Sequence, residues 1–189
     1  MGTARTTRER WIDEGLAALV AGGPDAVRVE VLAKRIGVTK GGFYGYFADR
    51  QALLDAILDR WRADSVDDVL AAVERTGGER TAQAVLAGQL TFGDKVLPID
   101  MAVREWARRD VGVAERLRDV DNQRMNLLRR VFADRCADED ELEARCLIAF
   151  SVAIGSRLLH ADHGGRSREQ VLETVTRMIV DPVTKPESD

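Results

Sequence analysis

The chain has 189 residues, enough to bury the core of one or two helical domains. Hydrophobic residues make up 45% and charged residues 32% of it. No apolar run reaches the roughly 18–20 residues that a membrane span needs. The N-terminus has no signal-peptide hydrophobic region, so we expect a soluble, cytoplasmic protein without a membrane partner.

The net charge of −4 argues by itself against a nucleic-acid partner, but the charge is unevenly distributed. Residues 1–50 carry eight Lys or Arg and six Asp or Glu, a net charge of +2, which leaves −6 for the remainder. This distribution is typical of a DNA-binding head on an acidic body.

The first elements form a small helical head. A helix is predicted over residues 8–21, where apolar residues recur at helical spacing and Gly22-Gly23-Pro24 follows as a stop signal. A second helix is predicted over residues 29–36, and Gly37 follows it where a left-handed residue ends a helix. Thr39 is the predicted N-cap of a third helix, its hydroxyl accepting a backbone N–H.

The third predicted helix, about Lys40 to Tyr46, is unusual. It opens with Gly41 and Gly42, and each glycine costs about 0.5–1 kcal/mol relative to alanine in a helix interior. Packing or a partner must therefore hold this helix, and its missing side chains let another molecule approach closely. Free N–H groups beside a lysine suit a polyanion. Together with residues 29–36 the pattern predicts a helix-turn-helix, although an ordinary helical hairpin has the same periodicity.

The head needs further support from a fourth helix, predicted from an Asp49 N-cap toward Gly77-Gly78. At about 1.5 Å per residue this helix is long enough to act as a lever between the head and the rest of the chain. The apolar residues expected in the core of the head are Trp11, Leu16, Leu19, Val31, Leu32, Ile36 and Phe43.

The rest of the chain is also predicted to be helical, with no strand-like alternation. The expected helices are 81–92, 98–109 with Pro98 in its first turn, 114–135, 139–160 and 167–180, followed by a frayed tail. We therefore predict an all-α fold of about nine helices. A three-helix head with the helix-turn-helix occupies residues 1–48, and a larger helical ligand-binding and dimerisation domain occupies residues 49–189.

The last two helices are predicted to form a homodimer interface. Small residues between larger apolar ones permit close helix approach, and two such helices from each chain would build a four-helix interface. The alternative is that they only complete the core of a monomer. The candidate interface residues are Leu147, Phe150, Ile154, Leu158, Val171, Leu172, Val175 and Met178.

The segment GVTKGGFYGYF followed by ADRQALLDAIL resembles the TetR family of bacterial transcriptional regulators. The resemblance covers roughly Arg8 to Trp61, about a third of the chain, and includes the glycine turn, the aromatic pairs at 43–44 and 46–47, and the basic residue that enters the next helix. The family usually has Thr or Ser where this chain has Val29. Arg28 is therefore the candidate for the phosphate contact at this position.

Chemical reasoning assigns roles within the head. Lys40 can reach a guanine edge or a phosphate, while Tyr44 and Tyr46 can donate to phosphate or touch a thymine methyl. Thr39 can donate to phosphate, and Arg50 can clamp phosphate with help from the helix dipole. The resemblance implies that most of these positions face the operator. The candidate DNA-binding residues are Arg28, Thr39, Lys40, Gly41, Gly42, Tyr44, Tyr46 and Arg50.

The sequence has no GxSxG, P-loop or GxGxxG motif, so we expect neither an enzyme nor a bound cofactor. His160 and His163 could form part of a metal site, but no further ligands are evident nearby, and we predict no metal. Cys136 and Cys146 lack a CxxC pattern and are interpreted as small buried residues.

The resemblance implies a small-molecule pocket in the body. The candidate ligand-binding residues are Trp61, Leu86, Gln89, Leu90, Phe92, Met101, Arg104, Trp106 and Met125, although plain core is the simpler interpretation of each. Arg104 could pair with an anionic ligand or with Asp100.

The leading hypothesis is a homodimeric repressor that an unknown small-molecule effector releases from a palindromic operator. A ligand in the body would shift the fourth helices and change the separation of the two recognition helices, which must match grooves about 34–36 Å apart. The alternatives are a transcriptional activator or a ligand-independent regulator. An alternative of another class is a helical small-molecule-binding or catalytic module with a vestigial head.

Overall fold

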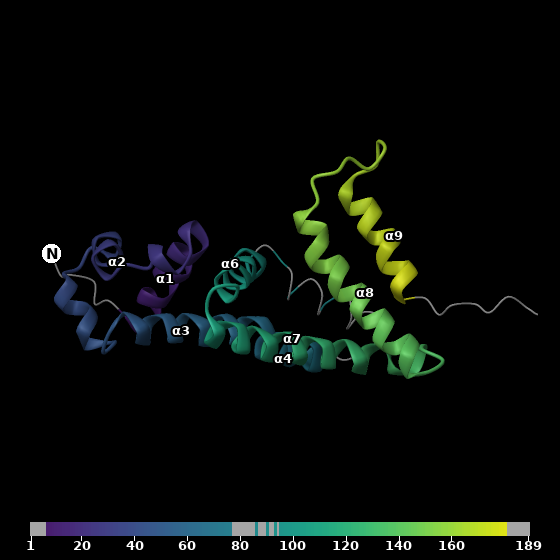
Figure 1. The fold of residues 1–189 in the computed structure, drawn as a ribbon, viewed down its shortest axis with the longest axis horizontal. Helices are drawn as coiled ribbons and strands as arrows, with labels where there is room; N and C mark the ends of the chain where they lie inside the picture. The colour runs from purple at the N-terminus through teal and green to yellow at the C-terminus, as the bar shows by residue number, and fades with distance from the viewer. Residues whose placement is uncertain (1–6, 77–85, 87–89, 91–92, 94, 181–189) are drawn as a thin grey trace, which may run out of the picture. The chain divides into compact units, whose positions relative to one another are not determined.

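The computed structural model describes residues 7–76, 86, 90, 93 and 95–180. These residues form helices and no strands, so the all-α fold class is confirmed (Figure 1). Their contacts divide the chain into two compact units, one of Met1–Val69 with Gly93–Val120 and one of Leu70–Phe92 with Asp121–Asp189. Within the described part of the chain, no helix is long and apolar enough to cross a membrane.

The first unit is built around α1 (Arg8–Gly22), which contacts α2 (Val29–Ile36), α3 (Arg50–Arg62) and α6 (Leu97–Ala107). Two short 3-10 helices, η1 (Pro24–Ala26) and η2 (Lys40–Gly45), connect these elements. The apolar stripes predicted from the sequence face inward, and the fully buried side chains of this unit include Trp11, Leu19, Leu53 and Ile57.

The helix boundaries in this unit are set by local caps and turns, of which the Gly22-Gly23-Pro24 stop and the Asp49 cap were predicted and the Thr7 cap was not. The Thr7 side chain accepts a hydrogen bond from the Arg10 N–H and begins α1. Gly23, with a φ of 71°, ends that helix ahead of Pro24. The Asp49 carboxylate accepts from the Ala52 N–H at 2.8 Å, which confirms the predicted N-cap of α3.

The predicted long helix after Asp49 contains an interruption that its periodicity does not show. A π-helical turn, η3 (Ala63–Asp67), separates α3 from α4 (Asp68–Thr76). The turn buries Asp64, whose carboxylate accepts from Arg60 Nε at 2.9 Å and lies 3.3 Å from Lys95 Nζ. The helix predicted over residues 81–92 falls almost entirely outside the described residues.

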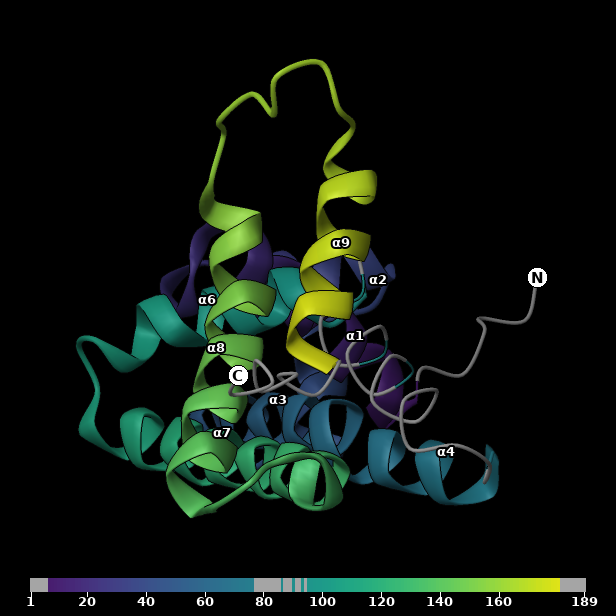
Figure 2. The same cartoon turned by 90° about the vertical axis from the view of Figure 1, so that its right-hand side faces the viewer.

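The second unit contains α8 (Glu139–Leu158) and α9 (Arg168–Val180), which lie side by side (Figure 2). Helix α7 (Val111–Phe132) runs from the first unit into the second and ends in a 3-10 turn, η4 (Ala133–Arg135). Arg145 of α8 donates through Nη1 to the Ile179 carbonyl of α9 at 2.7 Å. Arg168 of α9 donates to the carbonyls of Ser156 and Leu159, so both ends of the helix pair are tied together.

Helix α8 begins within an acid-rich segment, residues 137–143, at the predicted residue Glu139. The Asp138 carboxylate accepts from the Glu141 N–H at 2.8 Å, and the Glu141 carboxylate accepts from the Ala137 N–H at 2.8 Å. This reciprocal arrangement satisfies backbone donors that the helix itself leaves unpaired.

Candidate nucleic-acid interface

The turn between α2 and η2 has the predicted geometry. Gly37 has a φ of 82°, and the N–H groups of Gly37 and Val38 both donate to the Ala33 carbonyl, at 3.0 and 2.9 Å. A left-handed residue at this point ends α2 and reverses the chain without steric cost for glycine. Segment η2 then begins after a single extended residue, Thr39.

Two local predictions about η2 are wrong. The segment ends at Gly45 instead of Tyr46 and is a 3-10 helix instead of an α-helix. The Thr39 side chain makes no capping hydrogen bond, and the Gly42 N–H instead donates to the Thr39 backbone carbonyl at 3.0 Å. The tighter winding explains both differences, because the i to i+3 pattern satisfies a donor that an α-helix would leave to the cap.

An aromatic cluster holds η2 in place. Phe43 is fully buried, with its ring 5.2 Å from Trp11 in an edge-on contact and 5.4 Å from Phe47 in a stacked one. Buried aromatic pairs contribute about 0.5–1.5 kcal/mol beyond their burial. This packing supplies the stability that the glycine-rich sequence lacks. It confirms the prediction that Phe43 is a core residue, and Phe47 is buried beside it.

Helix α2 turns a narrower apolar face inward than predicted. Val29, Leu32, Ala33 and Ile36 are buried, but Val31 is 39% exposed and does not belong to the core of the head. Its position lies off the i, i+3, i+4, i+7 series of the inward face.

The opposite side of η2 is open to solvent. Lys40, Gly41, Gly42, Tyr44 and Tyr46 are all exposed, Tyr44 by 57%. A Cβ atom added at Gly42 would meet no atom within 4 Å, and one at Gly41 would meet only Thr39 Oγ1, at 3.8 Å. Neither glycine has a positive φ. Neither backbone conformation nor internal packing therefore requires glycine at these positions.

The one basic side chain on η2 is paired across the helix-turn-helix. Lys40 Nζ lies 2.5 Å from Glu30 Oε1 of α2, and both side chains are exposed. This hydrogen bond raises the pKa of Lys40 and lowers the pKa of Glu30. Sequence reasoning missed Glu30; the signal was the opposite charges on two helices that a tight turn brings together.

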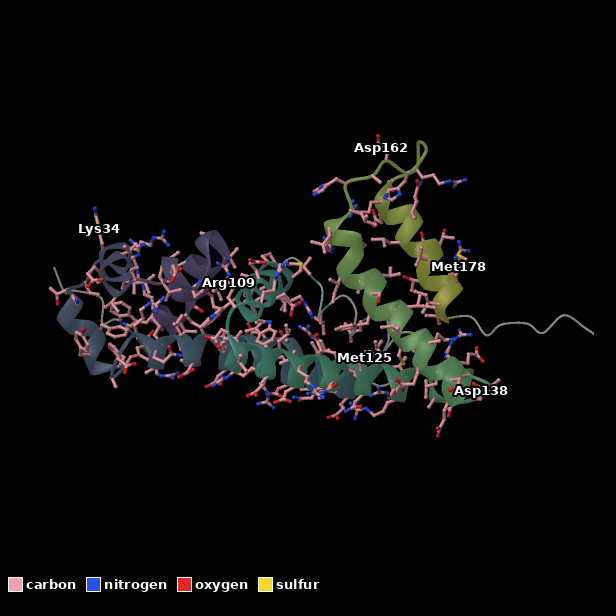
Figure 3. The ribbon with its side chains drawn as sticks, viewed as in Figure 1. Lys34, Arg109, Met125, Asp138, Asp162 and Met178 are labelled. Carbon is pink, nitrogen blue, oxygen red and sulfur yellow. The ribbon has the colours of Figure 1, made fainter. Side chains whose placement is uncertain are left out.

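Arg50 and Arg28 make contacts inside the head. The half-buried Arg50 donates through Nε to the Val27 carbonyl at 2.7 Å and through Nη2 to the Pro24 carbonyl, and so ties α3 to the link after α1. Arg28 donates through Nε to the Asp25 carbonyl at 3.0 Å and is exposed. Figure 3 shows the exposed Lys34 projecting away from α2. The phosphate contacts expected of Arg28 and Arg50 stay predictions.

Two of the nine candidate ligand residues converge on one buried carboxylate. Asp100 of α6 is fully buried and accepts from Trp61 Nε1 at 3.2 Å and from Arg104 Nε at 2.8 Å. The structure does not bring the rest together in one described site. Met101 and Trp106 lie on α6, Leu86 and Leu90 are isolated described residues, Met125 belongs to the second unit, and Gln89 and Phe92 lie outside the described residues.

The candidate dimer residues lie on α8 and α9, and three of them are strongly exposed. Leu147 and Leu158 are each 60% exposed and Met178, labelled in Figure 3, is 75% exposed. Ile148, which was not predicted, is 53% exposed beside Leu147. The remaining candidates, Phe150, Ile154, Val171, Leu172 and Val175, are half-buried.

The thiols are shielded to different extents. Cys146 is buried and Cys136 is half-buried, and both are free. Burial raises the pKa of the Cys146 thiol to about 11 and also raises that of Cys136.

Comparison with known proteins agrees with this geometry. Residues 12–57 match the model of the bacterial regulatory proteins of the tetR family. A TetR transcriptional regulator from Legionella pneumophila superposes with a TM-score of 0.70 at 17% identity, over 93% of this chain and 96% of that one. FadR from Bacillus subtilis, in complex with stearoyl-CoA, superposes with a TM-score of 0.68 at 13% identity, over 94% of this chain and 100% of that one.

AibR, in complex with isovaleryl coenzyme A and operator DNA, superposes with a TM-score of 0.65 at 15% identity, over 93% of this chain and 100% of that one. Among curated proteins, none matches the sequence. At such low sequence identity, these superpositions show a shared fold and nothing further. The family match covers the helix-turn-helix described above. Residues 12–57 are thus similar to the tetR family of bacterial regulatory proteins, and the superpositions show that the chain shares the fold of solved transcriptional regulators.

Proposed function

We propose that the chain is a homodimeric repressor that binds a palindromic operator through two copies of η2 and leaves it when a small molecule binds the body. The observation that carries this proposal is the open face of η2, where two glycines with free space lie beside a lysine and a tyrosine. Glycines that nothing inside the protein requires fit a surface that a DNA backbone or base edge approaches closely.

The residues of η2 also indicate how DNA would be read. Lys40 is the only basic residue between positions 37 and 48, so each subunit offers few hydrogen bonds to base edges. Phosphate contacts and the shape of the duplex should therefore contribute much of the specificity. Binding through phosphates weakens steeply with salt.

The test uses a duplex that the purified protein selects from a random pool. Lys40→Ala and Tyr44→Ala should each weaken binding, for Lys40 by about 1–3 kcal/mol if it contacts a guanine, or about 5- to 150-fold in Kd. Lys34→Ala is the matched control, because Lys34 is also an exposed lysine of the helix-turn-helix but lies on α2. Wild-type affinity in both η2 variants, with the same secondary structure by circular dichroism, would remove the assignment.

The exposed apolar residues of α8 and α9 support the dimer. Leu147, Leu158 and Met178 are large apolar side chains at least 60% exposed, and exposed apolar side chains that gather into one patch mark protein contact surfaces. Leu158→Glu should give a monomer by light scattering coupled to size exclusion, because a desolvated carboxylate is costly in an apolar interface. Val111→Glu is the control: Val111 is 77% exposed at the start of α7 and should tolerate the charge. A dimeric Leu158→Glu protein would place the interface elsewhere.

The structural neighbours supply the first effector class to test. FadR and AibR were each solved with a coenzyme A thioester. Acyl-CoA thioesters of graded chain length should be titrated into the complex with DNA, with free coenzyme A as the control. Saturable release by one chain-length range would support the proposal. Reporter expression in a deletion strain then distinguishes the two kinds of regulator. Deletion of a repressor raises expression of the reporter, and deletion of an activator lowers it.

A further inference from the structure

The Glu30 carboxylate shares an exposed surface with the residue proposed to contact DNA. Its Oε1 atom lies 2.5 Å from Lys40 Nζ, and the two side chains are 63% and 52% exposed. The ion pair bridges α2 and η2, the two helices of the helix-turn-helix. It therefore joins the proposed DNA-contacting cation to an anion on the neighbouring helix.

This ion pair contributes little to the stability of the fold. Exposed ion pairs contribute little to stability, because water and salt screen them and both long side chains lose freedom. The head already has a buried aromatic cluster that fixes η2. The hydrogen bond raises the pKa of Lys40 and lowers that of Glu30, so both groups stay charged at neutral pH. In the free protein, Lys40, the only basic residue of η2, is therefore paired with the negative charge of Glu30.

For Lys40 to contact DNA, its ion pair with Glu30 must break. A phosphate that approaches Lys40 also meets the repulsion of the Glu30 carboxylate. A guanine edge instead presents two neutral acceptors, O6 and N7, in a fixed position within the major groove. The carboxylate therefore penalises diffuse contact with the phosphate backbone more than contact with a correctly placed base.

We propose that Glu30 is a specificity-determining residue that competes with DNA for Lys40 and so suppresses binding to non-operator sequence. The proposal rests on the proposed function of η2 as the DNA-contacting segment. Glu30 lowers the affinity for every duplex, and it lowers the affinity for a random duplex more than for the operator.

The experiment compares wild type, Glu30→Gln and Glu105→Gln on two duplexes in a series of salt concentrations. One duplex is selected from a random pool by the wild-type protein, and the other is scrambled at the same length and composition. Glu105→Gln is the matched control, since it also removes one acid and breaks an exposed ion pair, the one between Glu105 of α6 and Arg109. Circular dichroism and thermal melting check that each variant is folded.

Glu30→Gln should bind the scrambled duplex about 3- to 10-fold more tightly, while its affinity for the selected duplex changes less, so the ratio of the two affinities falls. One freed lysine per subunit should steepen the salt dependence on the scrambled duplex, by about 0.9 in log–log slope for each added phosphate contact. Glu105→Gln should behave as wild type. In a Lys40→Ala background, Glu30→Gln should give a smaller gain than in the wild type.

Weaker binding of Glu30→Gln to the scrambled duplex would show that Glu30 positions Lys40 for DNA, and would overturn the proposal. Equal tightening on both duplexes, an unchanged salt slope, or an undiminished gain without Lys40 would also overturn it. A wild-type protein that binds no duplex with salt dependence would instead refute the proposed function of η2, a result that is distinguishable from these.

Discussion

Replacing Gly42 with alanine should stabilise the free protein and weaken its binding to DNA. The added Cβ meets no atom of the chain within 4 Å, and the backbone at this position does not have a positive φ. Alanine should therefore raise the free energy of unfolding by about 0.5–1 kcal/mol, the usual cost of glycine relative to alanine in a helix. For a chain of this size, that gain corresponds to a rise in Tm of about 1–4 °C.

The same methyl group should obstruct DNA. Inserting a methylene into a well-packed contact costs about 1–3 kcal/mol, which corresponds to about 5- to 150-fold in Kd. Thermal melting followed by circular dichroism measures the first effect, and fluorescence anisotropy with the selected duplex measures the second. Gly112→Ala in α7 is the control, since its Cβ would make only an ordinary contact, 3.4 Å from Asp110 Oδ1. It should leave DNA binding unchanged.

The expected result is a higher Tm together with a weaker affinity for DNA. A Gly42→Ala protein with a lower Tm would show that glycine is needed for the fold of η2. A protein with higher Tm and wild-type affinity for DNA would show that the open space above Gly42 faces only solvent. Either result would refute the reasoning that connects the glycine pair to a DNA interface.

Three further predictions concern the stability of the chain. Arg50→Met should lower the free energy of unfolding by about 1–3 kcal/mol in urea titrations, because it leaves the Val27 carbonyl without its charged donor. Arg50→Lys should not restore that stability; full recovery would show that charge alone matters. Asp100→Asn should lower the free energy of unfolding by a similar amount, about 1–3 kcal/mol, because the buried Trp61 N–H then donates to a neutral acceptor instead of a carboxylate. An unchanged urea midpoint would contradict this. The pKa of Cys146 rises from 9.0 to about 11 on folding, so its contribution to stability is complete below pH 9 and is lost as the pH rises toward 11. Its reaction with a disulfide reagent at pH 9 should be slow in the native protein and fast in urea.

The head was largely predictable because its signals are local. Gly37 ends α2 in the left-handed conformation, and the Asp49 side chain caps α3, as their residue types indicate. Each signal acts within a few residues of itself, so it can be read without knowledge of the tertiary fold. The 3-10 winding of η2 was not predictable, since it depends on how Phe43 packs against Trp11 from a different helix.

The long-range partners of charged side chains were the main omission. Sequence spacing could not show that Arg50 would reach the carbonyls of Pro24 and Val27, or that Asp100 would accept from Trp61. These contacts join residues 23 to 39 positions apart and follow from the packing of α3 against its neighbours. The π-turn η3 was hidden for a similar reason, because one extra residue in a turn leaves the apolar periodicity nearly unchanged.

In the proposed complex, two copies of the open face of η2 enter the major groove of one duplex. Methylation of guanine N7 by dimethyl sulfate tests it most directly, since N7 lies in the major groove. We expect two protected segments, on one face of the duplex and about 10 base pairs apart or a multiple of that spacing, and we expect Gly42→Ala to reduce protection in both. A single protected segment, or N7 atoms that remain reactive in a complex the protein forms stably, would contradict it.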